Sequence, residues 1–219
     1  MGTGTFAQVL DFHLRADSDY DVVGFTADQT QDMESSFLGR PLVPFDTVAD
    51  VFPPTDHAMF VAVGYRKRSS IRARLCEAAR QKGYELITYV SSTAHHHDDL
   101  VTGMNCCILG EATLEPFVTL GHDVIVWGGA HISHHTTVGD HCFLGPQAAI
   151  ASETRIGKHC FIGINATIRD GITVADDCFI GAGAIILRDT QPGEVYVGGA
   201  HHDVPSVAAT PALSAHPDL

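Results

Sequence analysis

The chain has 219 residues and carries 26 acidic against 13 basic side chains, which gives a formal net charge of −13. This length suits one large domain or two small ones. The charge argues against a surface for nucleic acid or anionic membrane. No apolar run approaches the ~20 residues that a membrane span needs, and the opening "MGTGTFAQ" lacks the parts of a signal peptide. We therefore expect a cytoplasmic protein.

The N-terminal part alternates predicted helices and strands. "MGTGTFAQVLDFHL" predicts a glycine-rich turn and an amphipathic helix, with Phe6, Val9, Leu10 and Leu14 on one face. The stretches "YDVVGFTAD", "HAMFVAVG" and "YELITYV" predict strands. Between the last two, "SSIRARLCEAARQKG" predicts a helix. Its expected caps are Ser69 or Ser70 at the start and Gly83 at the end. This alternation indicates a small parallel α/β domain over residues 1–92.

The opening turn Gly2-Thr3-Gly4, followed by Asp28 at a strand end, has the pattern of a nucleotide-phosphate site. A purely structural turn is the alternative, because Thr5-Phe6-Ala7 replaces the usual third-glycine spacing. The strand that should precede such a turn is also absent ahead of Met1. Either the natural chain starts several residues earlier, or this domain lacks its first strand.

Aliphatic residues then recur at every sixth position without a miss. The fourteen are Ile108, Leu114, Leu120, Val126, Ile132, Val138, Leu144, Ile150, Ile156, Ile162, Ile168, Val174, Ile180 and Ile186. A mostly small residue stands two places before each. This period is typical of the hexapeptide repeat of a parallel β-helix, in which three units close one triangular coil. We expect four to five coils within residues 93–198, with each aliphatic side chain inside the prism.

Glycines and cysteines follow the same period. Gly121, Gly139, Gly145, Gly157, Gly163 and Gly181 directly follow aliphatic positions, where we expect the chain to turn. Cys106, Cys142, Cys160 and Cys178 share the small inward register, which predicts buried free thiols. No C-x-x-C spacing indicates a metal site.

Histidines gather in "WGGAHISHHTTVGDHCF", residues 127–143. Together with the N-terminal domain, this segment and "IGKHCFIGINATI" resemble the sialic-acid O-acetyltransferase (NeuD-type) family of sugar acyltransferases over roughly residues 1–198. The resemblance implies a small Rossmann-like domain followed by a left-handed β-helix. It further implies a homotrimer that uses acetyl-CoA as co-substrate. The acceptor it implies is an amino or hydroxyl group of a sugar that is linked to a nucleotide.

The resemblance also assigns site residues. His134 matches the family's catalytic histidine in "ISHHTTVGD", and His131, His135 and Asp140 are candidates for lining the cleft or orienting that ring. On the acyl-CoA side the matches are Phe143, Ile164 and Ala182. On the substrate side they are Gly2, Thr3, Gly4, Asp28 and Gly64. Two departures are His135, where relatives commonly have an acid, and Phe143, where they often have histidine.

A histidine base suits acyl transfer, because the attacking amine or hydroxyl must lose a proton and imidazole accepts protons near neutral pH. We therefore expect direct transfer without a covalent enzyme intermediate and without a metal. Two alternatives stay open: a zinc-dependent γ-type carbonic anhydrase-like hydratase, and a non-catalytic trimeric β-helix scaffold.

The remaining histidines are interpreted as solvated. His122, His141 and His159 are expected at exposed corners, and "HHHDD" over residues 95–99 as an exposed connection between the domains. Residues 199–219 lack apolar periodicity and contain Pro211 and Pro217, which predicts a flexible C-terminal extension.

Overall fold

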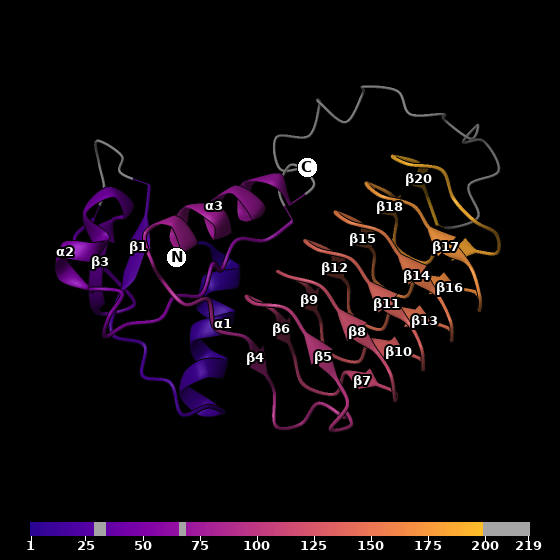
Figure 1. The fold of residues 1–219 in the computed structure, drawn as a ribbon, viewed down its shortest axis with the longest axis horizontal. Coiled ribbons are helices and arrows are strands. Elements are labelled where there is room, and N and C mark those ends of the chain that lie inside the picture. The colour runs from indigo at the N-terminus through magenta and orange to yellow at the C-terminus, as the bar shows by residue number, and fades with distance from the viewer. Residues whose placement is uncertain (29–33, 66–68, 199–219) are drawn as a thin grey trace.

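The computed structural model describes residues 1–28, 34–65 and 69–198. A small α/β unit leads into a long parallel β-helix whose coils stack away from it (Figure 1). No helix among these residues is both long and apolar enough to cross a membrane. The predicted flexible extension, 199–219, lies outside the described residues.

The α/β unit follows the predicted alternation of helix and strand. Its elements are α1 (Thr5–Ala16), β1 (Phe25–Ala27), β2 (Ser36–Phe37), β3 (Arg40–Pro44), η1 (Phe45–Thr47), α2 (Val48–Val51) and α3 (Ser70–Gln81). Strand β1 pairs with β3 in parallel, and β2 pairs with β3 antiparallel. Helix α1 buries Phe6, Leu10 and Leu14 as predicted, whereas Val9 is only partly buried.

The predicted N-cap residue of α3 is at the expected position, but its side chain does not cap the helix. Ser69 stands at the N-cap with φ 57°, and its side chain makes no capping hydrogen bond. An N-cap side chain reaches the first helical N–H groups from an extended backbone, so the left-handed conformation of Ser69 turns its hydroxyl away. At the other end, Gly83 takes φ 90°, as the predicted helix stop requires.

The last predicted strand of the α/β unit is shared with the β-helix. Leu86 bridges Met59 in parallel, which continues the N-terminal sheet. Three residues later, β4 (Tyr89–Val90) pairs with β6 (Cys107–Ile108), a strand of the β-helix. The β-helix therefore begins at Tyr89, slightly before the predicted boundary at residue 93.

The β-helix is left-handed and has three faces, each formed by a sheet of short parallel strands. Its further strands are β5 (Val101–Thr102), β7 (Thr113–Leu114), β8 (Thr119–Leu120), β9 (Ile125–Val126), β10 (His131–Ile132), β11 (Thr137–Val138), β12 (Phe143–Leu144), β13 (Ala149–Ile150), β14 (Arg155–Ile156), β15 (Phe161–Ile162), β16 (Thr167–Ile168), β17 (Thr173–Val174), β18 (Phe179–Ile180), β19 (Ile185–Ile186) and β20 (Val195–Tyr196). Each strand pairs with the strand one coil along, so Ile132 lies beside Leu114 and Ile150.

The interior of the prism is filled as the six-residue period predicts. All fourteen aliphatic residues of the repeat are at most 3% exposed. The four cysteines of the small register are free and buried, and burial raises the pKa of the Cys106 thiol to about 11. A thiol held in this protonated form acts as a small apolar group, which confirms the prediction for these cysteines.

The glycines that follow the aliphatic residues do not make the turns, so that expectation is wrong. The left-handed residue of each corner lies three places after the aliphatic position, as at His135 and His141. Gly145 instead allows neighbouring coils to stack closely, since a Cβ there would lie 2.8 Å from the backbone nitrogen of Ile164. The same holds at Gly163, where a Cβ would meet the Ala182 nitrogen at 2.7 Å.

Candidate active site

His134 lies at the corner between β10 and β11, and its side chain is exposed. Simple alternation from buried Ile132 would turn it inward, but the corner breaks that alternation. The next residue, His135, takes φ 58° and donates its N–H to the Pro116 carbonyl of the preceding coil at 3.2 Å. The corner therefore presents the His134 imidazole to solvent on a rigid backbone.

Glu115, one coil earlier, is the carboxylate that binds this corner. Its Oε2 accepts the His134 N–H at 2.9 Å, and its Oε1 lies 3.0 Å from His131 Nε2. The bond from the His134 amide, followed by the His131 contact, holds the pKa of Glu115 below its ordinary value. Glu115 is therefore ionised at neutral pH and anchors the backbone of His134 rather than its ring.

The ring of His134 contacts the ring of His135. Their Nδ1 atoms are 3.1 Å apart, and the two planes are perpendicular. The His135 ring in turn packs on Phe117 of the preceding coil, with centroids 4.6 Å apart. His135, where the resemblance leads one to expect an acid, is thus itself held by an aromatic neighbour.

Asp140, the other candidate for orienting His134 or lining the cleft, makes its contacts elsewhere within the chain. It lies at the next corner, between β11 and β12. Its carboxylate accepts the His122 N–H at 2.9 Å and pairs with Lys158 Nζ at 3.0 Å. Asp140 lies six residues after His134, which is one third of a triangular coil. Its side chain is therefore at a different edge of the prism.

Two of the three histidines interpreted as solvated are partly buried. His122 is exposed as expected, but His141 and His159 stack with ring centroids 4.8 Å apart. The α/β unit covers this corner, because the Arg72 guanidinium donates to the His141 carbonyl and the Tyr65 hydroxyl to the His159 carbonyl. Residues 95–99 are exposed throughout, as predicted, but they lie within the first coil of the β-helix rather than between the two units, since His95 bridges Thr113.

Phe143 begins a ladder of aromatic rings on the face that meets the α/β unit. Phe143, Phe161 and Phe179 stack one per coil, with centroid separations of 5.1 and 4.6 Å and nearly parallel planes. Tyr65 packs against this ladder, 4.8 Å from Phe161. Each of the three phenylalanine rings is partly exposed.

Ile164 and Ala182 lie together, but not with His134. Both are exposed and occupy the corner that follows β15 and β18, one coil apart. His134 stands at the corner that follows β10, and one strand of the coil separates neighbouring corners. Within one chain the predicted base and the predicted acyl-CoA contacts therefore belong to different edges of the prism.

The predicted substrate residues meet at one edge of the N-terminal sheet. Gly2 donates its N–H to Thr26 in β1, and Ala62 donates to the Met1 carbonyl, so residues 1–2 lie between these two segments. Three adjacent parallel segments thus end at this edge. The residues that follow their carboxyl ends are the turn Gly2-Thr3-Gly4, Asp28 and Gly64. That is the edge at which open α/β sheets bind ligands.

Close backbone packing explains the first glycine of the turn. Gly2 has φ 120°, and a Cβ there would lie 2.6 Å from the Ala62 carbonyl oxygen. Gly4 is the N-cap of α1 and is exposed. Asp28, also exposed, faces Arg74 of α3 at 3.7 Å. Gly64 directly precedes Tyr65, which places this edge next to the aromatic ladder.

Sequence reasoning missed Glu115, Tyr65 and Arg72. Glu115 could have been found from the repeat, since it lies one coil before Ser133, the neighbour of His134. Tyr65 and Arg72 carry no such signal, because their contacts depend on how the α/β unit docks. Within the described ranges, no three His, Cys, Asp or Glu side chains cluster as a metal ion would require.

Two family models match the β-helix. The bacterial transferase hexapeptide (six repeats) matches residues 117–152, and the hexapeptide repeat of succinyl-transferase matches residues 153–188. A search of curated proteins finds no match. The chain therefore carries transferase-type hexapeptide repeats over the segment that contains His134.

Solved structures extend the likeness to the α/β unit. The acetyltransferase domain of PglB from Neisseria gonorrhoeae, in complex with acetyl coenzyme A, is 26% identical with a TM-score of 0.80, over 89% of this chain and 92% of that one. PerB from Caulobacter crescentus, in complex with CoA and GDP-perosamine, is 24% identical with a TM-score of 0.76, over 90% and 91%. WeeI from Acinetobacter baumannii is 19% identical with a TM-score of 0.73, over 90% and 94%. The last two support the fold alone.

Proposed function

We propose that this chain is an acyl-CoA-dependent sugar acetyltransferase in which His134 is the general base. The observation that carries the proposal is the likeness, over nine-tenths of the chain, to the PglB acetyltransferase domain that binds acetyl coenzyme A. The transferase repeats over residues 117–188 agree with it. The narrower assignment to the sialic-acid O-acetyltransferase family stays a prediction, as does a cytoplasmic location.

The reaction is direct transfer. The acceptor nitrogen or oxygen attacks the thioester carbon, its proton passes to His134, and the carbon–sulfur bond breaks as the thiolate of coenzyme A leaves. The thiolate then takes up a proton. A positioned imidazole contributes typically ~10²–10⁴ in rate to such a step.

The contact with His135 favours Nε2 as the nitrogen of His134 that acts. Nδ1 of His134 faces Nδ1 of His135 at 3.1 Å, which leaves Nε2 free for the acceptor. For Nε2 to take a proton, Nδ1 must carry one and donate it to His135. His135 therefore acts as the hydrogen-bond acceptor that relatives supply with a carboxylate, and it does so only when its own Nδ1 is unprotonated.

The site is shared between copies of the chain. His134 and the pair Ile164 and Ala182 lie on different edges of one prism, so a single chain does not bring the base to the predicted acyl-CoA contacts. Packing of one prism beside another brings unlike edges together. A homotrimer of the kind that the resemblance implies closes three such sites.

The acceptor is held from the α/β unit. The turn Gly2-Thr3-Gly4 with Asp28 and Gly64 forms an edge suited to a nucleotide-linked sugar. Through Tyr65 this edge adjoins the aromatic ladder. This arrangement directs a long acceptor from the α/β unit toward the β-helix, which carries His134.

The test is release of coenzyme A thiol from acetyl-CoA in the presence of nucleotide-linked amino sugars. We expect turnover with at least one acceptor, and a loss of about 10²–10⁴-fold in kcat for His134→Ala. The matched control is His97→Ala, which removes an exposed imidazole in the first coil of the β-helix. Full activity of His134→Ala would refute its role, and no transfer to any sugar would refute the function.

A further inference from the structure

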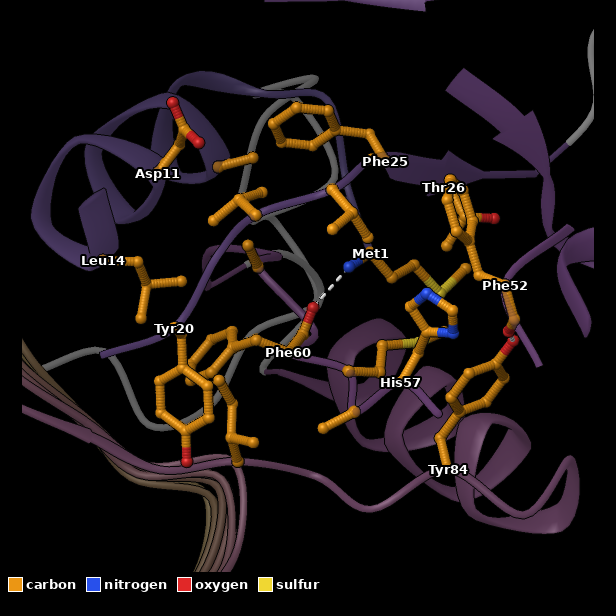
Figure 2. A pocket seen from close by; sticks show the side chains of 18 of the residues that line it. Met1, Asp11, Leu14, Tyr20, Phe25, Thr26, Phe52, His57, Phe60 and Tyr84 are labelled. Carbon is orange, nitrogen blue, oxygen red and sulfur yellow. Dashed lines mark hydrogen bonds between the residues drawn. The ribbon is translucent and has the colours of Figure 1, made fainter. Parts of the chain in front are cut away.

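Phe117 is a residue of the β-helix that the proposed reaction does not use directly. It lies one coil before His135, and the two rings pack with centroids 4.6 Å apart. The cavity of about 520 Å³ in Figure 2 is farther from the chemistry, because its lining residues all belong to the α/β unit. Phe117 is therefore the feature closer to the reacting groups.

The backbone of Phe117 has a conformation that a bulky side chain disfavours. Its φ is 67°, in the left-handed region, where asparagine and aspartate are much more common than large apolar residues. Among the described corners of the β-helix, every other left-handed residue is polar or glycine, as at Asn105, Asp123 and Asn165. Phenylalanine thus stands where asparagine would fit the backbone better.

Burial does not explain the choice of phenylalanine at this corner. The residue is 59% exposed, so it contributes less apolar burial than a phenylalanine of the core. Its N–H donates to the Asp99 carboxylate at 2.6 Å, whereas the equivalent N–H of His135 donates to the backbone carbonyl of Pro116. Hydrogen bonds to a carboxylate are stronger than those to a neutral acceptor. Asp99 therefore holds this strained corner in place.

The Phe117 ring restricts the ring of His135. The imidazole packs on Phe117 with an interplanar angle of 43°, and its Nδ1 lies 3.1 Å from Nδ1 of His134. An exposed side chain without such a neighbour changes rotamer within nanoseconds. Its hydrogen bonds also compete with water. The aromatic contact therefore keeps His135 beside His134.

We propose that Phe117 is a positioning residue, whose ring holds His135 against His134 so that their Nδ1 atoms share one proton. This inference rests on the proposed role of His134 as the base. Phe117 does not touch the reacting atoms and acts only through His135. Backbone strain of the kind seen at Phe117 clusters at functional sites, where the surrounding structure maintains it.

Phe117→Asn tests this role, because asparagine suits a left-handed backbone and removes the ring. We expect kcat to fall by about tenfold, which is the effect of one hydrogen bond on a rate, with unchanged KM for acetyl-CoA and for the acceptor. The Tm should change by less than about 3 °C. Phe117→Tyr keeps the ring and should keep kcat. The matched control is Glu111→Asn at a left-handed corner of another edge, where φ is 61°, and it should also keep kcat.

Nitrogen NMR of ring-labelled histidine gives a readout that a merely structural role would not change. In the natural chain at mildly alkaline pH, the shifts of the two Nδ1 atoms should together account for one bound proton. In Phe117→Asn both rings should show the tautomer mixture of free imidazole, and Phe117→Tyr should keep the natural pattern. These spectra need no turnover. They test Phe117 even where the natural chain transfers no acyl group and the proposed function fails.

Unchanged ring spectra in Phe117→Asn, or an unchanged kcat in an active enzyme, would overturn the proposal. A higher KM with unchanged kcat would also overturn it, because the ring would then contact a substrate. A lower particle mass by light scattering would assign the ring to a contact between copies of the chain. A fall in Tm well beyond that of Glu111→Asn would make the ring a support of the fold, and each of these two results would equally exclude the positioning role.

Discussion

Replacing Arg72 by methionine tests how the α/β unit is fixed to the β-helix. Arg72 lies in α3, and its guanidinium donates from Nε to the Asp123 carboxylate at 2.7 Å. The two side chains are 0% and 1% exposed. The same guanidinium also donates to the carbonyls of Val63, Asp123 and His141. Methionine keeps most of the stem and removes every one of these bonds.

The expected cost follows from burial of both charges. Removing one partner of a buried ion pair typically costs about 3–5 kcal/mol, because the other charge stays in the interior without compensation. Asp123 retains donors from Asn105 Nδ2 at 2.8 Å and from His141 Nδ1 at 2.9 Å, which favours the lower end of that range. For a chain of this size the Tm should fall by about 6–20 °C.

Thermal unfolding followed by circular dichroism measures this loss. The matched control is Arg80→Met in the same helix, where the pair with Glu77 is half exposed and should be worth only about 0–1 kcal/mol. The double variant Arg72→Met/Asp123→Asn should be more stable than the sum of the single variants predicts, because it also removes the stranded charge. Equal losses for Arg72→Met and Arg80→Met would refute the reasoning.

Three further predictions concern the site, the first residue and the prism. Glu115→Ala should lower kcat by about 10–100-fold, because it displaces His134, and it should not weaken coenzyme A binding. Glu115→Gln keeps an acceptor oxygen and should retain most of the activity. Equal kcat values for the natural chain and both variants would contradict this. Burial lowers the pKa of the Met1 amine from 8.0 to about 5. Between pH 5 and pH 8 the amine is therefore protonated in the unfolded chain but not in the folded one. The free energy of unfolding should accordingly fall by about 1.4 kcal/mol per pH unit as the pH drops from 8 to 5. When that amine is acetylated, the free energy of unfolding measured by urea titration should lose this dependence on pH. Ile150→Ala should cost about 2–5 kcal/mol, whereas replacement of exposed Ile185 should cost little.

The β-helix could be predicted almost residue by residue, because its interior repeats with a fixed period. Every aliphatic position from Ile108 to Ile186 is buried as expected. Two local details were not predictable from that period alone. The turn falls three places after the aliphatic residue, at positions such as His135, and the glycines serve the stacking of coils instead.

The α/β unit was predictable in its elements but not in its contacts. Helix α1 and the strand that ends at Ala27 follow from local patterns. The burial of His141 and the role of Arg72 arise where two units far apart in sequence meet, and no local pattern records such contacts.

The most direct test of the proposed function is a crystal structure with coenzyme A and a nucleotide-linked amino sugar bound. We expect a site between two copies of the chain, with the acceptor nitrogen about 3 Å from Nε2 of His134 and the coenzyme along Ile164 and Ala182 of the adjoining edge. A coenzyme bound elsewhere, with its sulfur remote from the ring of His134, would contradict it.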